Sequence, residues 1–319
     1  MKFLRVVPAG EGYRAELADG PRPVPASDEV LIEVAASGVN RADLSQIAGR
    51  YPPPPGEPEI LGLEVSGRVV GTGETVCALL AGGGHAEFAA APRGQLFPAP
   101  AGLDPVHAAG IPEAYLTAFL NLVFEAGLSS GGSLLVHAAA SGVGLAAIQI
   151  AKLLGARAAG TTRSAGKISA ILRAGAEVGI DTSQRSFADA LEERWGRDAV
   201  DVVLDPVGAA TLADDVRVLK TGGRVVFLAT LSGSKAELDI ARLMGKRGRL
   251  IGSTLRARSR AEKATLVGRF REEILPGFAT GALSVAVDSV FPPARAAEAF
   301  ERMKADRNVG KILIDWSGS

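Results

Sequence analysis

The residues in this 319-residue chain that are best suited to chemistry form a short segment rich in small side chains. Residues 136–144, with the sequence VHAAASGVG, follow an apolar strand pattern and open a helical one. Backbone N–H groups and the positive end of the helix dipole attract a pyrophosphate at such a turn. We therefore expect four residues to contact a dinucleotide: Ser141, Gly142, Val143 and Gly144. Ala139 replaces the usual first glycine, so a glycine-bearing turn without a ligand is the alternative.

A second group of polar residues indicates which dinucleotide binds. The next strand pattern ends in Thr162, Arg163 and Ser164, with Lys167 just beyond, and no acid lies between Gly144 and Glu177. Enzymes that select NAD usually place an acid here to bind the ribose 2′-hydroxyl. A guanidinium, an ammonium and a hydroxyl instead suit a 2′-phosphate. The sequence therefore predicts NADPH, and the alternative is a solvated helix start.

The elements that must position these residues alternate along residues 133–253. Apolar runs at 133–138, 158–162, 177–180, 200–204, 224–228 and 249–253 alternate with amphipathic helical patterns. This pattern is typical of a parallel sheet covered on both faces, and right-handed crossovers make it doubly wound with about six strands. Ligands of such sheets lie at the carboxyl ends of the strands. We therefore add three cofactor contacts from one later strand end: Leu228, Ala229 and Thr230.

The rest of the chain has a different pattern. The first ~115 residues alternate in short β-like runs broken by Gly and Pro, and residues 311–315 form a strand pattern with no partner in the alternating block. We assign that strand to the first domain, which becomes discontinuous. The predicted fold is α/β, with a β-rich domain at 1–117 and 268–319 and a nucleotide-binding domain at 118–267.

Composition excludes several other functions. Lys+Arg and Asp+Glu both number 35, so no net charge draws the chain to nucleic acid or to an acidic membrane. The basic residues between 246 and 260 have no aromatic neighbours and predict a solvated face. The apolar residues 134–160 include His137, Lys152 and Arg157, which favours a buried core over a membrane helix. A single cysteine, Cys77, and no apolar run after Met1 predict a reducing compartment, the cytoplasm.

Several segments together resemble a known family. They are 35–44 (AASGVNRADL), 49–56 (GRYPPPPG), 60–64 (ILGLE), 111–119 (IPEAYLTAF), 141–144 (SGVG) and 308–312 (NVGKI). The chain resembles the zeta-crystallin-like quinone oxidoreductases of the medium-chain dehydrogenase/reductase superfamily, and within them the tumour-suppressor-inducible branch. This resemblance covers nearly the whole chain. It implies a Rossmann domain, a GroES-like domain, NADPH as the hydride donor, Lys311 among the cofactor contacts, and a homodimer.

The resemblance also explains an absence. Zinc-containing relatives have a cysteine where Asn40 stands and a histidine where Leu63 stands, and neither residue present here binds zinc in the usual way. We therefore expect no metal, and Glu64 as a structural partner. Relatives often place a tyrosine on the 2′-phosphate near Thr182. Here that contact is missing, and Asp181 would weaken the preference for NADPH if it pointed inward.

The residues proposed to act on the substrate follow from the same resemblance. Tyr51 lies in a Pro-rich loop expected to face the cleft, where it could donate to a quinone oxygen or stack on the ring; packing on Pro52–Pro55 is the alternative. Asn40 could orient the nicotinamide ribose or the substrate, or simply form a turn. Ser141 resembles a serine linked to activity, but it could also bind only pyrophosphate. Thr117 lies where relatives contact the nicotinamide, with a helix-surface role as its alternative.

The sequence therefore predicts a zinc-independent enzyme that transfers hydride from NADPH to a small quinone. Such a reaction needs positioning and exclusion of water more than acid–base groups. One rival within enzymes is an NADPH-dependent enone or alkenal reductase, which adds the same hydride to carbon. The other rival is a non-catalytic NADPH-binding protein. His85, His107 and His137 are scattered in the sequence, and we expect His137 to be a core residue.

Overall fold

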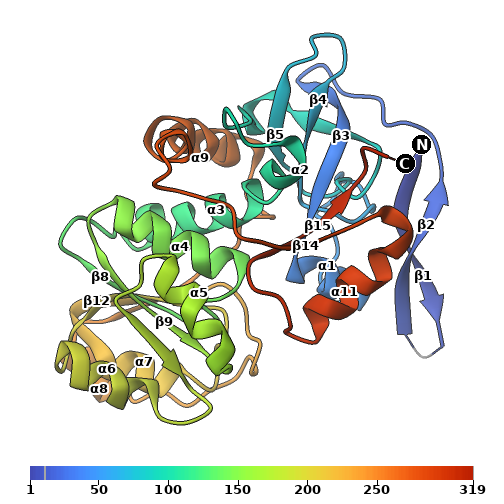
Figure 1. Cartoon of the computed structure of the whole chain (residues 1–319). Helices are drawn as coiled ribbons and strands as arrows, with labels where there is room; N and C mark the ends of the chain where they lie inside the picture. The colour runs from blue at the N-terminus through green and yellow to red at the C-terminus, as the bar shows by residue number, and fades with distance from the viewer. Residues whose placement is uncertain (11, 319) are drawn as a thin grey trace. The chain divides into compact units, whose positions relative to one another are not determined.

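The computed structural model describes residues 1–10 and 12–318. The chain divides into two compact units (Figure 1): unit 1 holds Met1–Leu116 and Leu255–Ser319, and unit 2 holds Thr117–Thr254. The domain limits that we predict from the sequence differ from these units at residue 117 and at residues 255–267, and they stay predictions. The second difference arises because α9 (Arg260–Glu273) packs against η1 (Arg93–Gln95) of unit 1.

Unit 2 is built on a parallel sheet. In the described part of the chain the strand order is β10-β9-β8-β11-β12-β13, and every neighbouring pair is parallel. The strands are β8 (Ser133–Val136), β9 (Arg157–Thr162), β10 (Val178–Asp181), β11 (Val200–Asp205), β12 (Leu219–Phe227) and β13 (Arg249–Gly252). The order reverses between β8 and β11, which makes the carboxyl ends of these two strands the expected ligand site. The doubly wound α/β prediction is confirmed.

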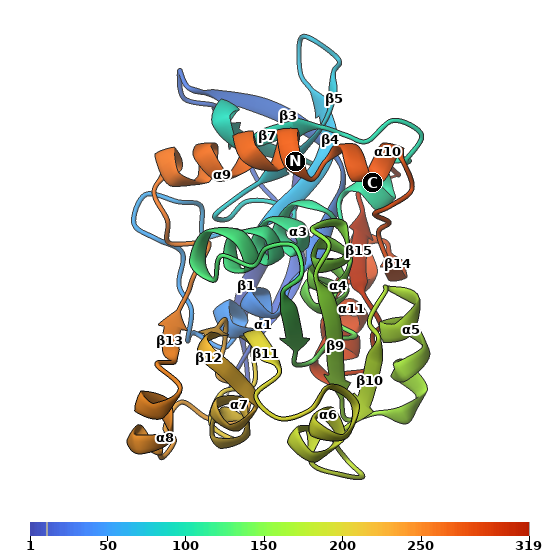
Figure 2. The ribbon, with the colours of Figure 1, turned by 90° about the vertical axis from the view of Figure 1, so that its left-hand side faces the viewer.

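Helices alternate with these strands (Figures 1 and 2). They are α4 (Gly142–Leu153), η3 (Ala165–Lys167), α5 (Ile168–Arg173), α6 (Phe187–Trp195), α7 (Leu212–Val218) and α8 (Ile240–Gly245). All four residues of β8 are buried, as expected for a central strand that helices cover on both faces. The core between strands and helices includes Leu135, Phe187 and Val203. Burial of such side chains stabilises each by about 1.5–3 kcal/mol.

The helical segment that begins at Pro112 is only partly regular. The segment forms α3 (Pro112–Phe119) and then η2 (Leu120–Glu125), which has π-helical hydrogen bonding. Such wide turns inside helices are uncommon and are not visible in the spacing of apolar residues. The limit between the two units falls within α3.

Unit 1 is rich in antiparallel strands. A two-stranded sheet joins β1 (Lys2–Ala9) to β2 (Gly12–Asp19), and the larger sheet has the order β14-β15-β3-β4-β5-β7 with β6 paired to β3, within the described residues. Its strands are β3 (Glu29–Val39), β4 (Glu64–Val69), β5 (Thr75–Leu79), β6 (Phe88–Pro92), β7 (Leu96–Pro98), β14 (Val287–Phe291) and β15 (Lys311–Asp315). The remaining helices are α1 (Arg41–Ile47), α2 (Pro105–Ala108), α10 (Pro276–Ala279), η4 (Pro293–Arg295) and α11 (Ala296–Lys304).

The assignment of residues 311–315 to the first domain is confirmed. Strand β15 pairs antiparallel with β3, with Ile312 opposite Val39, and parallel with β14. Because Lys311 begins β15 and Asn40 follows the last residue of β3, this register brings the two side chains together. The last strand of the chain thereby completes a site whose other residues come from its first third.

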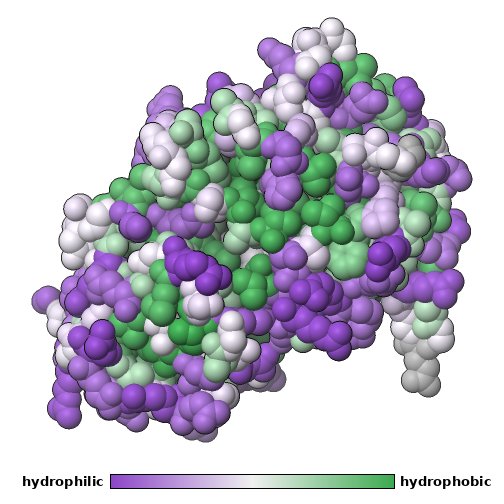
Figure 3. Space-filling model, in the orientation of Figure 1, coloured by the Kyte–Doolittle hydropathy of each residue, from purple (hydrophilic) through white to green (hydrophobic). Residues whose placement is uncertain are grey.

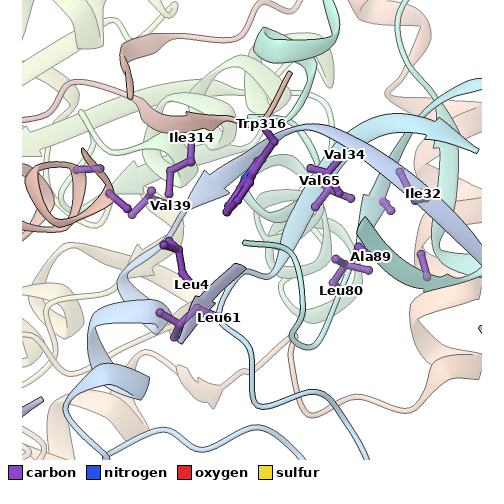
Figure 4. Packing of buried hydrophobic residues seen from close by; sticks show 14 of the residues in the cluster. Leu4, Ile32, Val34, Val39, Leu61, Val65, Leu80, Ala89, Ile314 and Trp316 are labelled. Atoms are coloured by element: carbon purple, nitrogen blue, oxygen red, sulfur yellow. The ribbon is translucent and has the colours of Figure 1, made fainter. Parts of the chain in front are cut away.

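The core of unit 1 lies along this sheet. Figure 4 shows Val39, Leu61 and Ile314 among the clustered apolar side chains. Trp316 packs with them, and its indole nitrogen donates to the buried hydroxyl of Ser37 over 2.9 Å. Pairing the indole N–H avoids the cost of leaving a buried donor unsatisfied. This core therefore holds β3 and β15 in a fixed register.

The surface mixes polar and apolar residues. In Figure 3 hydrophilic side chains are interspersed with apolar ones over the face shown. None of the helices in the described residues is long and apolar enough to cross a membrane. The interpretation of the apolar stretch as core is confirmed, since residues 134–160 form β8, α4 and β9 of the sheet unit.

Candidate functional site

The turn between β8 and α4 has the geometry of an anion-binding turn. Ser141 is the N-cap of α4, and its hydroxyl accepts a hydrogen bond from Gly144 N over 3.1 Å. The first helical residues, Gly142 and Val143, have backbone N–H groups with no acceptor inside the helix. A Cβ on Gly144 would lie 2.6 Å from the carbonyl oxygen of Ala139, so only glycine fits. This turn is open to a phosphate at the positive end of the helix dipole.

The structure also explains why Ala139 can replace a glycine. A Cβ on Gly160 of the neighbouring strand β9 would lie 2.6 Å from the Cβ of Ala139. The missing side chain of Gly160 therefore makes room for the methyl group of Ala139, which is fully buried. The turn is fixed further by Ala139 N, which donates to Thr161 O over 2.9 Å. The departure from the usual glycine pattern is thus compensated one strand away.

The basic residues predicted to bind a 2′-phosphate follow the end of β9. Arg163 and Ser164 are exposed, Lys167 is partly exposed at the end of η3, and Thr162 is buried. Thr162 Oγ1 accepts from Ser164 N over 3.3 Å, which shapes the turn that carries these side chains. All four residues lie within or just beyond the carboxyl end of one strand, next to the strand that leads to the phosphate turn.

Asp181 ends the adjacent strand β10. Its Oδ1 accepts hydrogen bonds from the backbone N and the hydroxyl of Ser183, over 2.9 and 2.8 Å. One carboxylate oxygen is therefore committed to the local turn. Thr182 is also held locally, because its backbone N donates to Thr162 O over 2.8 Å.

The third group of predicted cofactor residues follows β12. Leu228 N donates to Asp205 O over 2.9 Å, and Ala229 and Thr230 are exposed. The buried carboxylate of Asp205 accepts from Val207 N and from Thr211 Oγ1 over 2.5 and 2.8 Å. The turns after β11 and β12 are therefore tied to each other and to one buried acid, Asp205.

A buried ion pair joins the start of β15 to the start of β4 in unit 1. The Lys311 ammonium donates to Glu64 Oε1 (2.5 Å), Asn40 Oδ1 (2.7 Å) and Val39 O (3.1 Å). These acceptors equal in number the three hydrogens of an ammonium. Lys311 is 5% exposed and Glu64 is 0% exposed. The structure thus places Lys311, predicted as a cofactor contact, in a protein network, and Glu64 in the structural role expected of it.

Asn40 is the polar centre of this network. Its Nδ2 donates to Glu64 Oε1 over 2.9 Å and to Gly38 O over 3.1 Å. Its backbone N donates to Asp43 Oδ2 over 2.7 Å, as part of the N-terminal cap of α1. Both amide hydrogens and the amide oxygen of Asn40 therefore have partners within unit 1. Its predicted action on a ribose or a substrate stays a prediction.

Glu113 is a candidate residue that sequence reasoning missed. It is partly exposed at the start of α3, and its backbone N donates to Glu64 Oε2 over 2.8 Å. Burial, followed by the nearby Glu64 carboxylate, raises the pKa of Glu113 to about 8. A carboxylic acid that stays protonated near neutral pH is a proton donor. The only signal in the sequence was an acid in the first turn of a helix, which is common.

Tyr51 is held by an arginine that we expected on a solvated face. That prediction is wrong for Arg256, which is 3% exposed. Its guanidinium donates to Tyr51 O (3.1 Å), Gln46 Oε1 (2.7 Å) and Ala81 O (2.7 Å), and lies 5.1 Å from the Tyr51 ring centre. Burial, then Glu113, raises the pKa of Tyr51 against the effect of Arg256. The phenol therefore remains a donor at neutral pH.

The remaining predicted residue and the histidines are dispersed. Thr117 is partly exposed in α3, and its carbonyl accepts from Asn121 Nδ2 over 2.7 Å. His85 bonds to Ser37 and His107 lies beside Asp104, whereas His137 lies in unit 2. Within residues 1–10 and 12–318, no group of three or more His, Cys, Asp or Glu side chains could hold a metal.

Comparisons with known proteins agree with this architecture. Residues 26–84 match the alcohol dehydrogenase GroES-like domain family, and residues 142–270 match the family described as zinc-binding dehydrogenase. The mouse quinone oxidoreductase is 31% identical, and the match covers 98% of this chain and 97% of the relative.

Two solved structures extend the comparison. The quinone oxidoreductase from Thermus thermophilus, which was also solved as its complex with NADPH, is 32% identical with a TM-score of 0.85 over 99% of this chain and 100% of that one. A 2-octenoyl-CoA carboxylase reductase in complex with NADP and 2-octenoyl-CoA is 25% identical with a TM-score of 0.82, over 96% of this chain and 83% of that one. The chain belongs to the zeta-crystallin-like quinone oxidoreductases of the medium-chain dehydrogenase/reductase superfamily.

Proposed function

We propose that this protein is a zinc-independent enzyme that transfers hydride from NADPH to a small quinone. NADPH-dependent oxidoreduction follows from membership of the family and from the NADPH complex of the Thermus relative. The observation that carries the finer proposal is the buried Lys311–Glu64 pair beside Asn40. It supports a reaction without zinc, because the network already holds a cation where zinc-containing relatives place ligands.

The residues present do not suit zinc. Asn40 and the buried, apolar Leu63 replace the expected cysteine and histidine. Zinc ligands are thiolates, imidazoles and carboxylates, and among positions 40, 63 and 64 only Glu64 provides one. Its carboxylate is already bound to the Lys311 ammonium, which would repel a second cation at that place. We therefore assign no step of the reaction to a metal.

The residues present do suit NADPH. We propose that Ser141, Gly142, Val143 and Gly144 hold the pyrophosphate at the N-terminus of α4, where a Cβ on Gly144 would obstruct the turn. Arg163, Lys167 and the hydroxyl groups of Thr162 and Ser164 would hold the 2′-phosphate, while Leu228, Ala229 and Thr230 would line the nicotinamide half. Thr117 and Lys311 remain proposed contacts. The nicotinamide, when bound, supplies the hydride.

The side chains of unit 1 would serve the acceptor. We propose that the Tyr51 hydroxyl donates a hydrogen bond to the acceptor oxygen, where negative charge develops as hydride arrives. Arg256 holds the Tyr51 backbone and lies against its ring, so the donor is fixed before the acceptor binds. Asn40 is proposed as an orienting residue, and Ser141 as a further hydroxyl near the reacting groups. Protons for the product oxygens come from water.

A panel of acceptors tests the reaction type. We expect prompt NADPH oxidation with small quinones and at least tenfold lower kcat/KM with enones and alkenals, measured by the loss of nicotinamide absorbance. The 2-octenoyl-CoA of one structural neighbour is an α,β-unsaturated thioester, and this supports α,β-unsaturated carbonyl compounds such as enones and alkenals as the second class of acceptor. Higher kcat/KM on enones would favour that reductase, and no turnover of any acceptor would favour a non-catalytic NADPH-binding protein.

The choice of dinucleotide has a separate test. Replacing Arg163 and Lys167 together by glutamine should weaken NADPH binding by at least tenfold and leave NADH binding unchanged, because only NADPH carries the 2′-phosphate. Arg173→Gln, at the far end of α5, is the matched control. Equal losses for the two dinucleotides would contradict the assignment of this site.

The proposed assembly and location are also open to test. Strand β13 is an edge of its sheet within the described residues, and Ile240 and Met244 of the adjacent α8 are 63% and 71% exposed. We propose that a second copy covers this edge to form a homodimer. The single cysteine, Cys77, is buried, and we propose a reducing location, the cytoplasm, which fractionation of the source cells would test.

A further inference from the structure

A buried cluster of titratable groups lies next to the proposed dinucleotide-binding turn of unit 2, residues 138–144. His137 is the residue between the end of β8 and that turn, and it is 2% exposed. Its Nε2 lies 2.7 Å from Asp215 Oδ1 of α7, and its Nδ1 lies 2.8 Å from Thr161 Oγ1 of β9. Asp215 is 0% exposed. The imidazole therefore joins three elements of the unit.

The contacts of Thr161 link this imidazole to the turn itself. The hydroxyl of Thr161 contacts His137, while its carbonyl accepts from Ala139 N of the turn over 2.9 Å. His137 N also donates to Leu204 O of β11 over 3.0 Å. The residue after His137, Ala138, has a φ of 48°, a conformation that is rare for non-glycine residues and persists where surrounding contacts enforce it. His137 and Thr161 supply such contacts.

The charges facing His137 favour its protonated form. Asp215 and Asp214 come from α7 and Asp205 from the end of β11, and all three raise the pKa of His137. Burial acts in the opposite direction and is the largest single effect, but the pKa remains above its ordinary value. The other contacting groups, Thr161 and the Phe187 ring 4.6 Å away, carry no charge. An imidazolium here donates through both nitrogens, to Asp215 and to Thr161.

The two buried aspartates need this positive charge. Asp205 is stabilised by Val207 N, Gly208 N and Thr211 Oγ1, but Asp215 Oδ2 is buried without a hydrogen-bond partner in the described part of the chain. Burial raises the pKa of Asp215 to about 6, with His137 opposing and Asp205 adding to the shift. Loss of the proton from His137 would leave buried carboxylates without a counter-ion next to a site for an anion.

We propose that His137 is a positioning residue whose imidazolium, held between Thr161 and Asp215, braces the dinucleotide turn and makes NADPH affinity depend on the protonation of His137. This inference rests on the proposed assignment of the turn at 138–144 as the pyrophosphate site. Deprotonation turns Nδ1 from a donor into an acceptor for the Thr161 hydroxyl, so that hydrogen bond loses its charge assistance. It also leaves uncompensated negative charge near the proposed pyrophosphate site.

Thermodynamic linkage supplies a direct test. If protonated His137 favours NADPH, then bound NADPH must raise the pKa of His137 by the matching amount. The chain has three histidines, so NMR of ¹³C-labelled histidine gives three resolvable ring signals, and the signal lost in His137→Gln identifies its own. We expect the pKa of His137 to be about one unit higher in the NADPH complex, which corresponds to about a tenfold rise in Kd as pH increases through it.

The same titration in variants separates a brace from a purely structural role. NADPH Kd is measured between pH 7 and 9.5, above the second pKa of about 6 of the 2′-phosphate. Asp215→Asn should lower the pKa of His137 and move the loss of affinity to lower pH with it. His137→Gln should bind NADPH weakly with a flat profile. Phe187 contacts the His137 ring and carries no charge. Phe187→Leu should therefore lower the free energy of unfolding but keep the wild-type dependence of NADPH Kd on pH.

Two results would overturn the inference and are distinguishable from each other. An unchanged pKa of His137 in the NADPH complex, with the Arg163/Lys167 double variant still losing NADPH selectively, would reject the brace alone. If the Arg163/Lys167 double variant bound NADPH as tightly as the wild-type protein, or if the wild-type protein did not bind NADPH, the proposed site and the inference would both be rejected. If His137→Gln does not fold, the wild-type and Asp215→Asn titrations still decide the question.

Discussion

Glu113, the second residue of α3, has a carboxyl group whose pKa is raised to about 8 by burial and by the nearby Glu64. Its position beside Glu64 illustrates how residue-scale chemistry in this chain depends on neighbours distant in sequence. The sequence identified Asn40, Glu64 and Lys311 separately, through their segments, but not their contacts. Nor could it identify Glu113, Arg256 or Asp215, because burial and a neighbouring charge, not residue type, make them chemically unusual.

Replacing Glu113 should change how stability depends on pH. Because its folded pKa is raised, the folded protein binds more protons than the unfolded protein between about pH 4.5 and 8, so this group lowers the free energy of unfolding as pH rises through that window. Glu113→Gln should flatten that part of the profile, measured by urea unfolding at several pH values. Glu301→Gln, on an exposed pair, is the control. An unchanged slope in Glu113→Gln would contradict the raised pKa.

Substitutions of Tyr51 should lower kcat/KM for the quinone proportionally more than they lower the free energy of unfolding. Tyr51→Phe removes the hydroxyl donor and should reduce quinone kcat/KM about tenfold, and Tyr51→Ala, which also removes the ring, should reduce it about a hundredfold. Tyr13→Phe on the exposed hairpin, where Tyr13 is 56% exposed, should have no effect. Full activity in both Tyr51 variants would remove this residue from the mechanism.

At the scale of elements, the alternating strand and helix patterns predicted unit 2 well, because buried parallel strands and amphipathic helices have distinct periods. The place of β15 in unit 1 followed from an unpartnered strand pattern, but its pairing with β3 did not. The π-helical turn of η2 and the packing of α9 on unit 1 depend on tertiary contacts, which periodicity does not encode. The fit of Ala139 against Gly160 likewise needs two adjacent strands to be seen together.

The Ala139–Gly160 fit predicts coupling between the two positions. Gly160→Ala should destabilise unit 2 by about 1–3 kcal/mol, because the new Cβ would overlap the Ala139 methyl group. Adding Ala139→Gly should recover part of that loss, although Ile171 Cγ2, 2.7 Å from the same Cβ position, would still have to move. Urea unfolding of the two single variants and the double variant gives the coupling energy. Additive effects would show that the two sites are independent.

At the scale of the whole molecule, the relatives support an NADPH oxidoreductase. The proposal of a homodimer is based on the exposed edge strand β13 and on the exposed apolar residues Ile240 and Met244 of α8. Placing like charges there should separate the copies without disturbing the proposed dinucleotide-binding turn. Ile240→Arg together with Met244→Arg should shift the mass from dimer to monomer in light scattering, because the like charges of the two copies repel, whereas Leu172→Arg on α5, at a residue 45% exposed, should not. An unshifted dimer would place the interface elsewhere.

An activity assay of metal-free protein tests most directly the central claim, that hydride passes from NADPH to a quinone without zinc. Protein stripped with a strong chelator and verified metal-free by elemental analysis is assayed for NADPH oxidation with a small quinone, before and after zinc is added back. Because the Lys311 ammonium already neutralises Glu64, we expect the stripped protein to keep its full kcat/KM and zinc to add nothing. Loss of activity on stripping, with recovery on adding zinc, would contradict the account.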